Sequence, residues 1–394
     1  MTGELMHRLQ TPEGMNALAV AAAADHGNPL AAASAVRSHG IAADLASAAL
    51  TQVELRRRAV AKFGAAAGRM FFTRAGLEQA TRAVVADRRA ARLAAAGVRT
   101  MADLGCGLGS DALAAARAGI SVYAVEADPD TAAVASANVT ALGLDHLIKV
   151  DCADATTVSV ADFDAVFADP ARRKAGRGRV FDPKSFSPPW DFVAALATRV
   201  PRTVLKLAPG IDHALLPPGA EGEWVSVDGD LVEAAFWCGP LAAAARRATL
   251  LSGTARPPAE LTGSGVAKAP VGAVGRYVYD PDPAVVRSHL VAEFAELIDG
   301  RLGDPEIAYV YSDTPADTPF ARRLEITDVL PFSLKRLRTL LRDRGVGRLE
   351  IRKRGSALEP EQLRRDLRLS GPSAASLILT RVAGAPTTLL CRPL

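Results

Sequence analysis

Three glycines that alternate with other residues after an acidic side chain form the most informative pattern in this chain. Asp103 ends a short apolar run, and the turn that follows contains Gly105, Gly107 and Gly109. Because glycine has no β-carbon, the backbone of such a turn can press against a flat or charged ligand. The spacing G-x-G-x-G differs from the dinucleotide pattern G-x-G-x-x-G, whose third glycine would fall on Ser110. We therefore expect a ligand-binding turn, with a turn that binds nothing as the alternative.

Further carboxylates follow at the ends of predicted strands. Glu126 ends an apolar run, where its side chain can accept hydrogen bonds from both hydroxyls of a ribose. Asp154 comes after a third predicted strand and Asp169 directly after a fourth. The elements that must position these side chains are strands at 98–104, 120–125, 147–150, 164–168 and 203–207 and helices at 111–118 and 130–142. This alternation predicts an α/β fold, a doubly wound, Rossmann-like sheet that holds a ligand along one edge.

These motifs, in this order, resemble the class I S-adenosylmethionine (SAM) methyltransferases. The resemblance implies SAM as the cofactor, with the adenine amino group bound by Asp154 and the methyl group beside Asp169. Asp169 is then the predicted catalytic residue, because the nucleophile must lose a proton there. The predicted cofactor-binding residues are Asp103, Gly105, Gly107, Gly109, Glu126, Asp154 and Asp169. An NAD-dependent oxidoreductase is a disfavoured alternative, because Ser110 replaces the third glycine.

The acceptor side of the predicted site departs from the methyltransferases that modify exocyclic amines. Their motif continues after Asp-Pro with a second proline and an aromatic ring, whereas Asp169 is followed by Pro-Ala-Arg-Arg. Arg172 resembles instead the Asp-Pro-Pro-Arg variant of some RNA base methyltransferases. Trp190 could stack on a flipped base or pack in the core. The predicted substrate-binding residues of this region are Pro170, Arg172, Arg173 and Trp190.

Methylation of a pyrimidine at carbon 5 requires a cysteine nucleophile. None of the four cysteines is well placed for this role in the predicted elements, so a nitrogen or oxygen acceptor is favoured.

Positive charge gathers near the C-terminus. The net charge is only +4, but residues 333–368 hold 12 Lys or Arg against 5 Asp or Glu. Such a surplus can bind phosphates without reading sequence, although the same side chains could face water or pair with carboxylates nearby. The predicted phosphate-binding residues are Lys335, Arg338 and Arg342, at helical spacing, and Arg352 and Arg354, on or just after the next strand.

The predicted domains are a helical N-terminal cap at 1–97, a SAM-binding domain at 98–252, a linker at 253–275 and a small α+β domain at 276–394. The last of these is similar to the THUMP-like domain of a bacterial group of SAM-dependent methyltransferases. The segments that carry this resemblance are 72–81, 169–173, 205–211, 346–355 and 379–382. THUMP domains accompany tRNA-modifying enzymes and bind RNA, so the resemblance implies a tRNA or rRNA base as substrate.

Composition limits the remaining classes of protein. With 49% hydrophobic and 23% charged residues, the chain is typical of soluble globular proteins. It has no apolar stretch long enough for a bilayer and no secretory signal pattern, and its cysteines lack metal-ligand spacing. We therefore expect a cytoplasmic enzyme without metal or membrane partner. Two alternatives stay open: a methyltransferase that acts on protein or a small molecule, and a SAM-binding, RNA-associated factor without catalysis.

Overall fold

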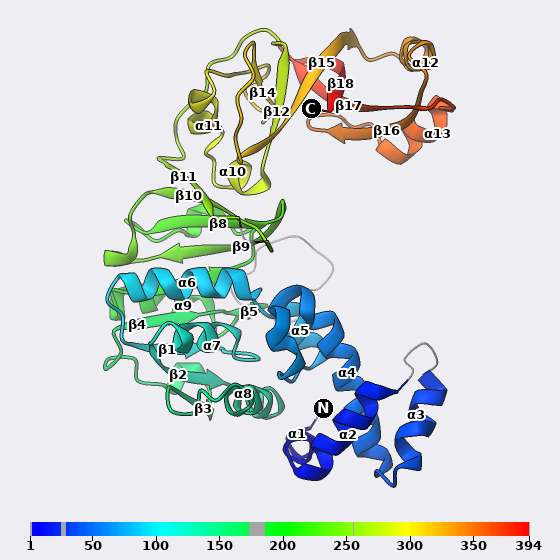
Figure 1. The fold of residues 1–394 in the computed structure, drawn as a ribbon. Helices are drawn as coiled ribbons and strands as arrows, with labels where there is room; N and C mark the ends of the chain where they lie inside the picture. The colour runs from blue at the N-terminus through cyan, green and yellow to red at the C-terminus, as the bar shows by residue number, and fades with distance from the viewer. Residues whose placement is uncertain (1, 25–28, 173–185, 255, 394) are drawn as a thin grey trace. The chain divides into compact units, whose positions relative to one another are not determined.

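The structure, a computed structural model, describes residues 2–24, 29–172, 186–254 and 256–393. The chain divides into two compact units (Figure 1). The first consists of Met1–Glu221 with Ala234–Ala243, and the second of Gly222–Glu233 with Ala244–Leu394.

A twisted sheet in the order β9-β7-β4-β1-β2-β3 organises the first unit. All neighbours in it pair in parallel except β7 and β9, which are antiparallel. Because β1 lies between β4 and β2, the strand order reverses there, which is where doubly wound sheets bind ligands. The strands are β1 (Thr100–Leu104), β2 (Ser121–Glu126), β3 (Ile148–Cys152), β4 (Ala165–Ala168), β7 (Thr203–Leu207) and β9 (Asp230–Trp237), of which β9 belongs to this unit from Ala234 onward.

Helices account for most of the N-terminal part and for the connections of the sheet, as the sequence predicts. Side-chain caps begin several of them; Asp128, for example, accepts the Thr131 N–H at 2.8 Å at the start of α8. Within the described residues, no helix is long and apolar enough to cross a membrane. The helices of this unit are α1 (Gly3–Leu9), α2 (Pro12–Ala23), α3 (Pro29–Ser38), α4 (Ala43–Phe63), α5 (Arg74–Gln79), α6 (Ala83–Ala95), α7 (Ser110–Arg117), α8 (Pro129–Leu142) and α9 (Trp190–Arg199).

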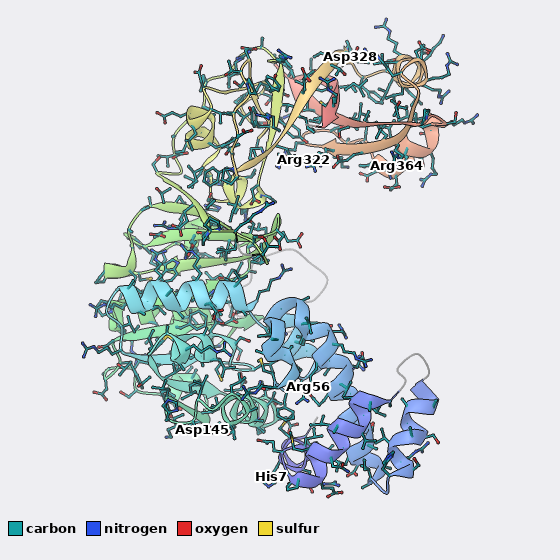
Figure 2. The ribbon with its side chains drawn as sticks, in the orientation of Figure 1. His7, Arg56, Asp145, Arg322, Asp328 and Arg364 are labelled. Carbon is teal, nitrogen blue, oxygen red and sulfur yellow. The ribbon has the colours of Figure 1, made fainter. Side chains whose placement is uncertain are left out.

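Buried polar contacts tie the N-terminal helices to the glycine turn. Asn138 of α8 accepts the Phe71 N–H at 2.6 Å and donates to the carbonyl oxygens of Phe71 and Leu108 at 3.1 and 3.0 Å. Arg56 of α4, labelled in Figure 2, lies 4.9 Å from the centre of the Phe71 ring. Since Leu108 belongs to the glycine turn, the helices before β1 help to fix the shape of that turn.

The second unit begins with the three strands β8 (Glu221–Val227), β10 (Arg246–Leu251) and β11 (Ala259–Gly263). Strand β10 pairs in parallel with β8 and antiparallel with β11, so the segment 253–275, for which we expected a linker, contains a paired strand. Two short helices follow, α10 (Pro283–Arg287) and α11 (Val291–Leu297). His289 between them has a φ of 64°, a left-handed conformation that an α-helix does not continue through.

The C-terminal part is a seven-stranded sheet in the order β13-β14-β12-β15-β18-β17-β16, with two helices. The pairs are antiparallel except for β16 with β17. One face packs against α12 and α13 through Leu337, Leu341 and Leu363, all buried. The elements are β12 (Tyr277–Pro281), β13 (Arg301–Leu302), β14 (Val310–Ser312), β15 (Ala321–Pro331), α12 (Leu334–Asp343), β16 (Val346–Lys353), α13 (Pro360–Leu367), β17 (Ser373–Val382) and β18 (Ala385–Pro393).

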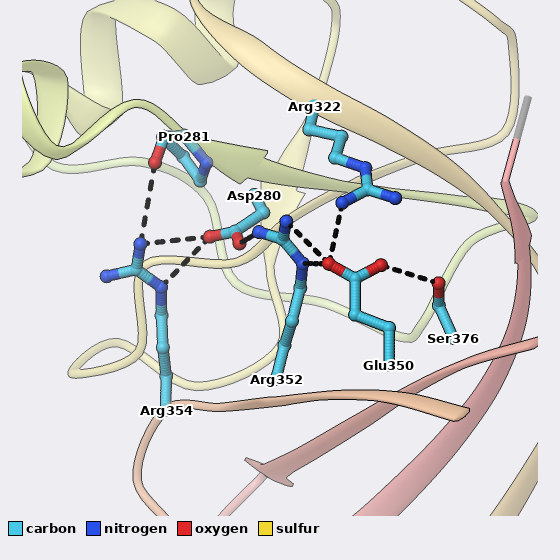
Figure 3. Close-up of polar contacts among 7 residues, drawn as sticks. All are labelled: Asp280, Pro281, Arg322, Glu350, Arg352, Arg354 and Ser376. Carbon is cyan, nitrogen blue, oxygen red and sulfur yellow. Dashed lines mark hydrogen bonds and ion pairs between the residues drawn. The ribbon is translucent and has the colours of Figure 1, made fainter. Parts of the chain in front are cut away.

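This sheet curves so that β12 and β16 meet on its other face. Four strand-to-strand steps separate the two strands, which would hold them about 19 Å apart in a flat sheet. Asp280 of β12 nevertheless accepts hydrogen bonds from Arg352 of β16 and from Arg354 just after it (Figure 3). Glu350 of β16 accepts another from Arg322 of β15 at 2.7 Å. The curvature therefore wraps the sheet around its second apolar cluster, which includes Val278, Tyr309, Ile378 and Leu389.

Candidate cofactor and acceptor site

The glycine turn after β1 depends on backbone conformations that favour glycine. Gly105, Gly107 and Gly109 have φ angles of 89°, 56° and 83°, all left-handed. A β-carbon on Gly105 would lie 3.2 Å from the carbonyl oxygen of Asp169, closer than most such contacts. The turn therefore brings the backbone after β1 against the residue that follows β4.

Glu126 at the end of β2 holds this turn. Its Oε2 accepts the Gly107 N–H and its Oε1 accepts the Asp128 N–H, both at 3.0 Å. A carboxylate has about four lone-pair sites, so two hydroxyl groups could still bind it. The side chain is therefore placed both to fix the turn and to bind a ribose.

Asp103 is a buried carboxylate without a partner. Its side chain is fully buried, and neither oxygen has a hydrogen-bond partner among the described residues. Burial raises the pKa of Asp103 well above its usual range, and the charges of Asp111 and Asp169 raise it further. The cations Arg89 and Lys206 act in the opposite direction. An unpaired carboxylate beside a ligand-binding turn is suited to a positively charged ligand.

Asp169 forms an ion pair that the sequence analysis did not identify. Lys206, the second-to-last residue of strand β7, places its Nζ 2.5 Å from Asp169 Oδ2. The lysine side chain is 12% exposed and that of Asp169 is 34% exposed. The only signal in the sequence was a lysine inside an otherwise apolar strand that ends at the ligand-binding edge.

The remaining predicted residues of this unit have differing environments. Asp154 is exposed after β3, and it accepts the Thr156 N–H at 2.8 Å. Arg172 lies in the short strand β5 (Ala171–Arg172), and Arg173 falls outside the described residues. Trp190 is 8% exposed and packs against Phe186, with 5.9 Å between the ring centres. The described geometry of Trp190 is therefore a packing contact, and its contact with a substrate stays a prediction.

The predicted phosphate-binding residues belong to the second unit and fall into two groups. Lys335 and Arg342 are exposed on α12, and Arg338 on the same helix donates to the carbonyl oxygen of Asp366 at 2.5 Å. Arg352 and Arg354 are instead about 30% exposed, and both form ion pairs with Asp280 (Figure 3). The structure thus separates an exposed basic helix from two arginines that are bound within the curved sheet.

Three of the four cysteines are poor nucleophiles. Cys106, Cys238 and Cys391 are buried, and burial raises the pKa of Cys238 to about 11 and that of Cys391 to about 12. The pKa of Cys106 is also raised, first by burial and then by the charges of neighbouring carboxylates. Because the thiolate is the reactive form, these three thiols are unsuited to attack a pyrimidine ring. Cys152 is exposed as the last residue of β3.

Three segments of the chain match known protein families. Residues 101–173 match a methyltransferase domain, residues 321–393 match the THUMP domain-like family, and residues 4–59 match a domain of unknown function, DUF8688. Two proteins of Mycobacterium tuberculosis, from strains CDC 1551 / Oshkosh and ATCC 25618 / H37Rv, are each 35% identical to this chain over 360 residues. Both are named as uncharacterized SAM-dependent methyltransferases, and each match covers 86% of this chain and 95% of the relative. The chain belongs to the SAM-dependent methyltransferases.

The fold of this methyltransferase agrees with that identification. A crystal structure of a candidate methyltransferase from Porphyromonas gingivalis W83 superimposes with a TM-score of 0.72 at 22% sequence identity. The superposition covers 90% of this chain and 92% of the other. The predicted fold class and the predicted THUMP-like domain are therefore confirmed.

SAM is the cofactor of this methyltransferase, as predicted. When bound, it supplies a methyl group carried by a positively charged sulfur. The residues present fit such a group, because Asp103 offers two unpartnered buried oxygens and Glu126 lies at the ribose-binding end of β2. Within the described residues, no three His, Cys, Asp or Glu side chains gather as a metal site would require. The contacts of each predicted cofactor-binding residue stay predictions.

Proposed function

We propose that this methyltransferase modifies RNA, and that its C-terminal domain binds the RNA through the basic face of α12. The proposal is supported by the match of residues 321–393 to the THUMP domain-like family together with the exposed cations of that helix. In this proposal the protein works in the cytoplasm, where tRNA and rRNA are available. A methyltransferase that acts on protein or a small molecule is the alternative.

The basic face of α12 is defined here as Lys335, Arg338 and Arg342. Leu337 and Leu341 of the same helix are buried against the sheet, so helical geometry directs the basic face away from it. The side chain of Arg342 is 76% exposed, and its closest carboxylate oxygen, on Asp343, is 3.8 Å away. Cations arranged in this way can contact successive phosphates.

In the first unit, the proposal assigns proton removal to Asp169 and contacts with the acceptor nucleotide to Pro170, Arg172, Arg173 and Trp190. Asp103, the glycine turn, Glu126 and Asp154 would bind the cofactor. Transfer from a sulfonium has an excellent leaving group, so most of the catalytic effect must come from positioning the acceptor in line with the methyl group.

The test is the transfer of tritium from methyl-labelled SAM to total RNA and, separately, to total protein of a bacterium. We expect acid-precipitable label that ribonuclease releases and protease does not. Label in protein alone would contradict the proposal. RNA binding without any transfer would support the alternative of a SAM-binding factor.

A second measurement tests the RNA-binding surface. Reversing Lys335, Arg338 and Arg342 to Glu should weaken RNA binding and lower the slope of log Kd against log salt by about one unit per lost phosphate contact. SAM affinity should not change, because the predicted cofactor residues belong to the first unit.

A matched control makes the same change of charge in the N-terminal helices, at Arg37, Arg57 and Arg58, which are all exposed. Equal losses of RNA affinity in both triple variants would show that the effect is a general one of net charge. Identical salt curves for the α12 variant and the wild type would contradict binding by the basic face.

A further inference from the structure

The ion pair between Lys206 and Asp169 places an ammonium group beside the predicted proton acceptor. The two side chains lie 2.5 Å apart, and they enter from the ends of neighbouring parallel strands, β7 and β4. The carbonyl oxygen of Asp169 borders the glycine turn at Gly105. In the proposed site the acceptor atom approaches the methyl group beside this turn, next to both members of the pair.

Two other cations of this region have other partners. Lys62 is close enough for the charge of Lys206 to lower its pKa, although burial lowers it more. Its Nζ donates to the carbonyl oxygens of Leu77, Glu78 and Ala80 at 2.8 to 2.9 Å, so its three protons are used at the end of α5. Arg89 forms a short ion pair with Asp111. Lys206 is therefore the ammonium group in contact with Asp169.

The sign of the charge that develops on the acceptor separates two kinds of chemistry. An amine that attacks the methyl group becomes positively charged, and an adjacent ammonium group opposes this change. A hydroxyl group that attacks gives up its proton and develops negative charge on oxygen, which an ammonium group stabilises. A carboxylate paired with an ammonium group thus suits a hydroxyl acceptor. The carboxylate can take the proton of the hydroxyl, and the ammonium group can stabilise the negative charge on its oxygen.

We propose that the methyl acceptor is the 2′-hydroxyl of a ribose rather than an amine of a base, an inference that rests on the proposed action on RNA. The 2′-hydroxyl is the alcohol that each nucleotide inside an RNA chain carries. The oxygen forms a bond to the methyl carbon as the bond from that carbon to sulfur breaks. The electron pair of the broken bond stays on sulfur, which becomes a neutral thioether, and the hydroxyl proton moves to the Asp169 carboxylate. Lys206 stabilises the negative charge on the oxygen during this step.

Alkaline hydrolysis of the labelled RNA tests the identity of the acceptor. Alkali cleaves RNA through the 2′-hydroxyl, so a methylated ribose leaves its label in an alkali-resistant dinucleotide. We expect the tritium there. Label in mononucleotides would mean base methylation and would overturn this inference while supporting the proposed action on RNA. Absence of label from RNA would overturn both.

Variants of Lys206 test its role independently of the product. Lys206→Met should lower kcat by about 100-fold, the usual effect of removing one group that stabilises an oxyanion, with an unchanged Kd for SAM. Lys206→Arg keeps the charge and should recover part of the rate. The rate of the Met variant should also rise with pH more steeply than that of the wild type, because the negative charge on the oxygen then forms without the stabilising ammonium group.

An amine acceptor would give a different response to the loss of Lys206. For an amine acceptor, removal of the ammonium group should leave kcat unchanged or raise it, and either outcome contradicts the proposal. A thermal melt of each variant shows whether it is folded. If the Met variant is not, the rate and pH profile of Lys206→Arg decide: a wild-type product with a reduced rate supports the role, and a rate equal to the wild type with an unchanged pH profile opposes it.

Discussion

Removal of the Glu126 carboxylate should weaken cofactor binding more than any single change elsewhere on β2. The carboxylate accepts the N–H groups of Gly107 and Asp128, both at 3.0 Å, and so joins the glycine turn to the start of α8. In the proposed site its remaining lone pairs bind two ribose hydroxyls. Glu126→Ala removes all of these contacts, and the two backbone N–H groups must then donate their hydrogen bonds to water.

The expected magnitude follows from the number and type of these contacts. Hydrogen bonds to a charged group each contribute about 1.5–3 kcal/mol. Because water can replace some of the lost hydrogen bonds, we expect Glu126→Ala to lose about as much binding free energy as one such bond contributes. The Kd for SAM should then rise about 10- to 150-fold. Glu126→Gln should lose less than Glu126→Ala, because its amide oxygen can still accept from one of the two N–H groups.

Isothermal titration calorimetry with SAM and with S-adenosylhomocysteine measures both variants. The control is Asp145→Ala, at the residue labelled in Figure 2. Asp145 accepts a hydrogen bond from Thr140 and lies before the first residue of β3. Glu126 is the last residue of the neighbouring parallel strand β2, so the two carboxylates lie at opposite ends of these strands. We expect the control to bind as the wild type does. An unchanged affinity in a folded Glu126→Ala variant would refute the placement of the ribose at this edge.

Three further changes test other parts of the structure. Asp103→Asn should weaken SAM binding about tenfold or more while raising the melting temperature of the cofactor-free protein, because it removes a buried charge without a partner. Burial raises the pKa of Asp103 in the folded state, so the wild type should lose stability as the pH rises above 3.8, the ordinary pKa of an aspartate. This part of the pH dependence should vanish in Asp103→Asn, and thermal melts across pH measure it. Lys62→Met removes three hydrogen bonds at the end of α5 and should lower the free energy of unfolding by about 1.5–3 kcal/mol in urea titrations, with an unchanged value counting against their importance. Asp280→Asn removes the carboxylate that pairs with Arg352 and Arg354, of which only Arg352 keeps a second carboxylate partner, Glu350, among the described residues. The change should lower the stability of the C-terminal domain by about 1–3 kcal/mol, seen as faster hydrogen exchange in β12 and β16; unchanged exchange would argue against the ion pairs.

The sheet of the first unit was largely predictable because its central strands β1, β4 and β7 are buried on both faces. Strand β7, for example, spans Thr203–Leu207, the bounds that its apolar residues predict. In the second unit, β15 (Ala321–Pro331) was not predicted, because its run of charged and apolar residues alternates irregularly. A register shift between Ile326 and Asp328, where β15 pairs with β18, accounts for that irregularity.

The candidate site was predictable only as far as local motifs reach. The glycine turn and Glu126 are recognisable because each is defined by neighbours in the sequence. The pairing of Lys206 with Asp169 joins residues 37 positions apart, and neither residue type reveals its partner. Arg352 and Arg354 were expected on a phosphate-binding surface, but a carboxylate more than 70 positions away, Asp280, pairs with both. Side-chain contacts between distant segments depend on the fold, so a single sequence does not specify them.

The curvature of the C-terminal sheet bears on where this domain begins. The THUMP domain-like match starts at residue 321, the first residue of β15. Strand β12 pairs with β15 along Tyr277–Pro281, and its Asp280 forms ion pairs with two arginines of the matched region. A protein truncated at Ala321 would expose a long unpaired strand edge, which promotes aggregation. The segment that sequence comparison recognises is therefore shorter than the smallest piece that we expect to fold by itself, which must start before β12.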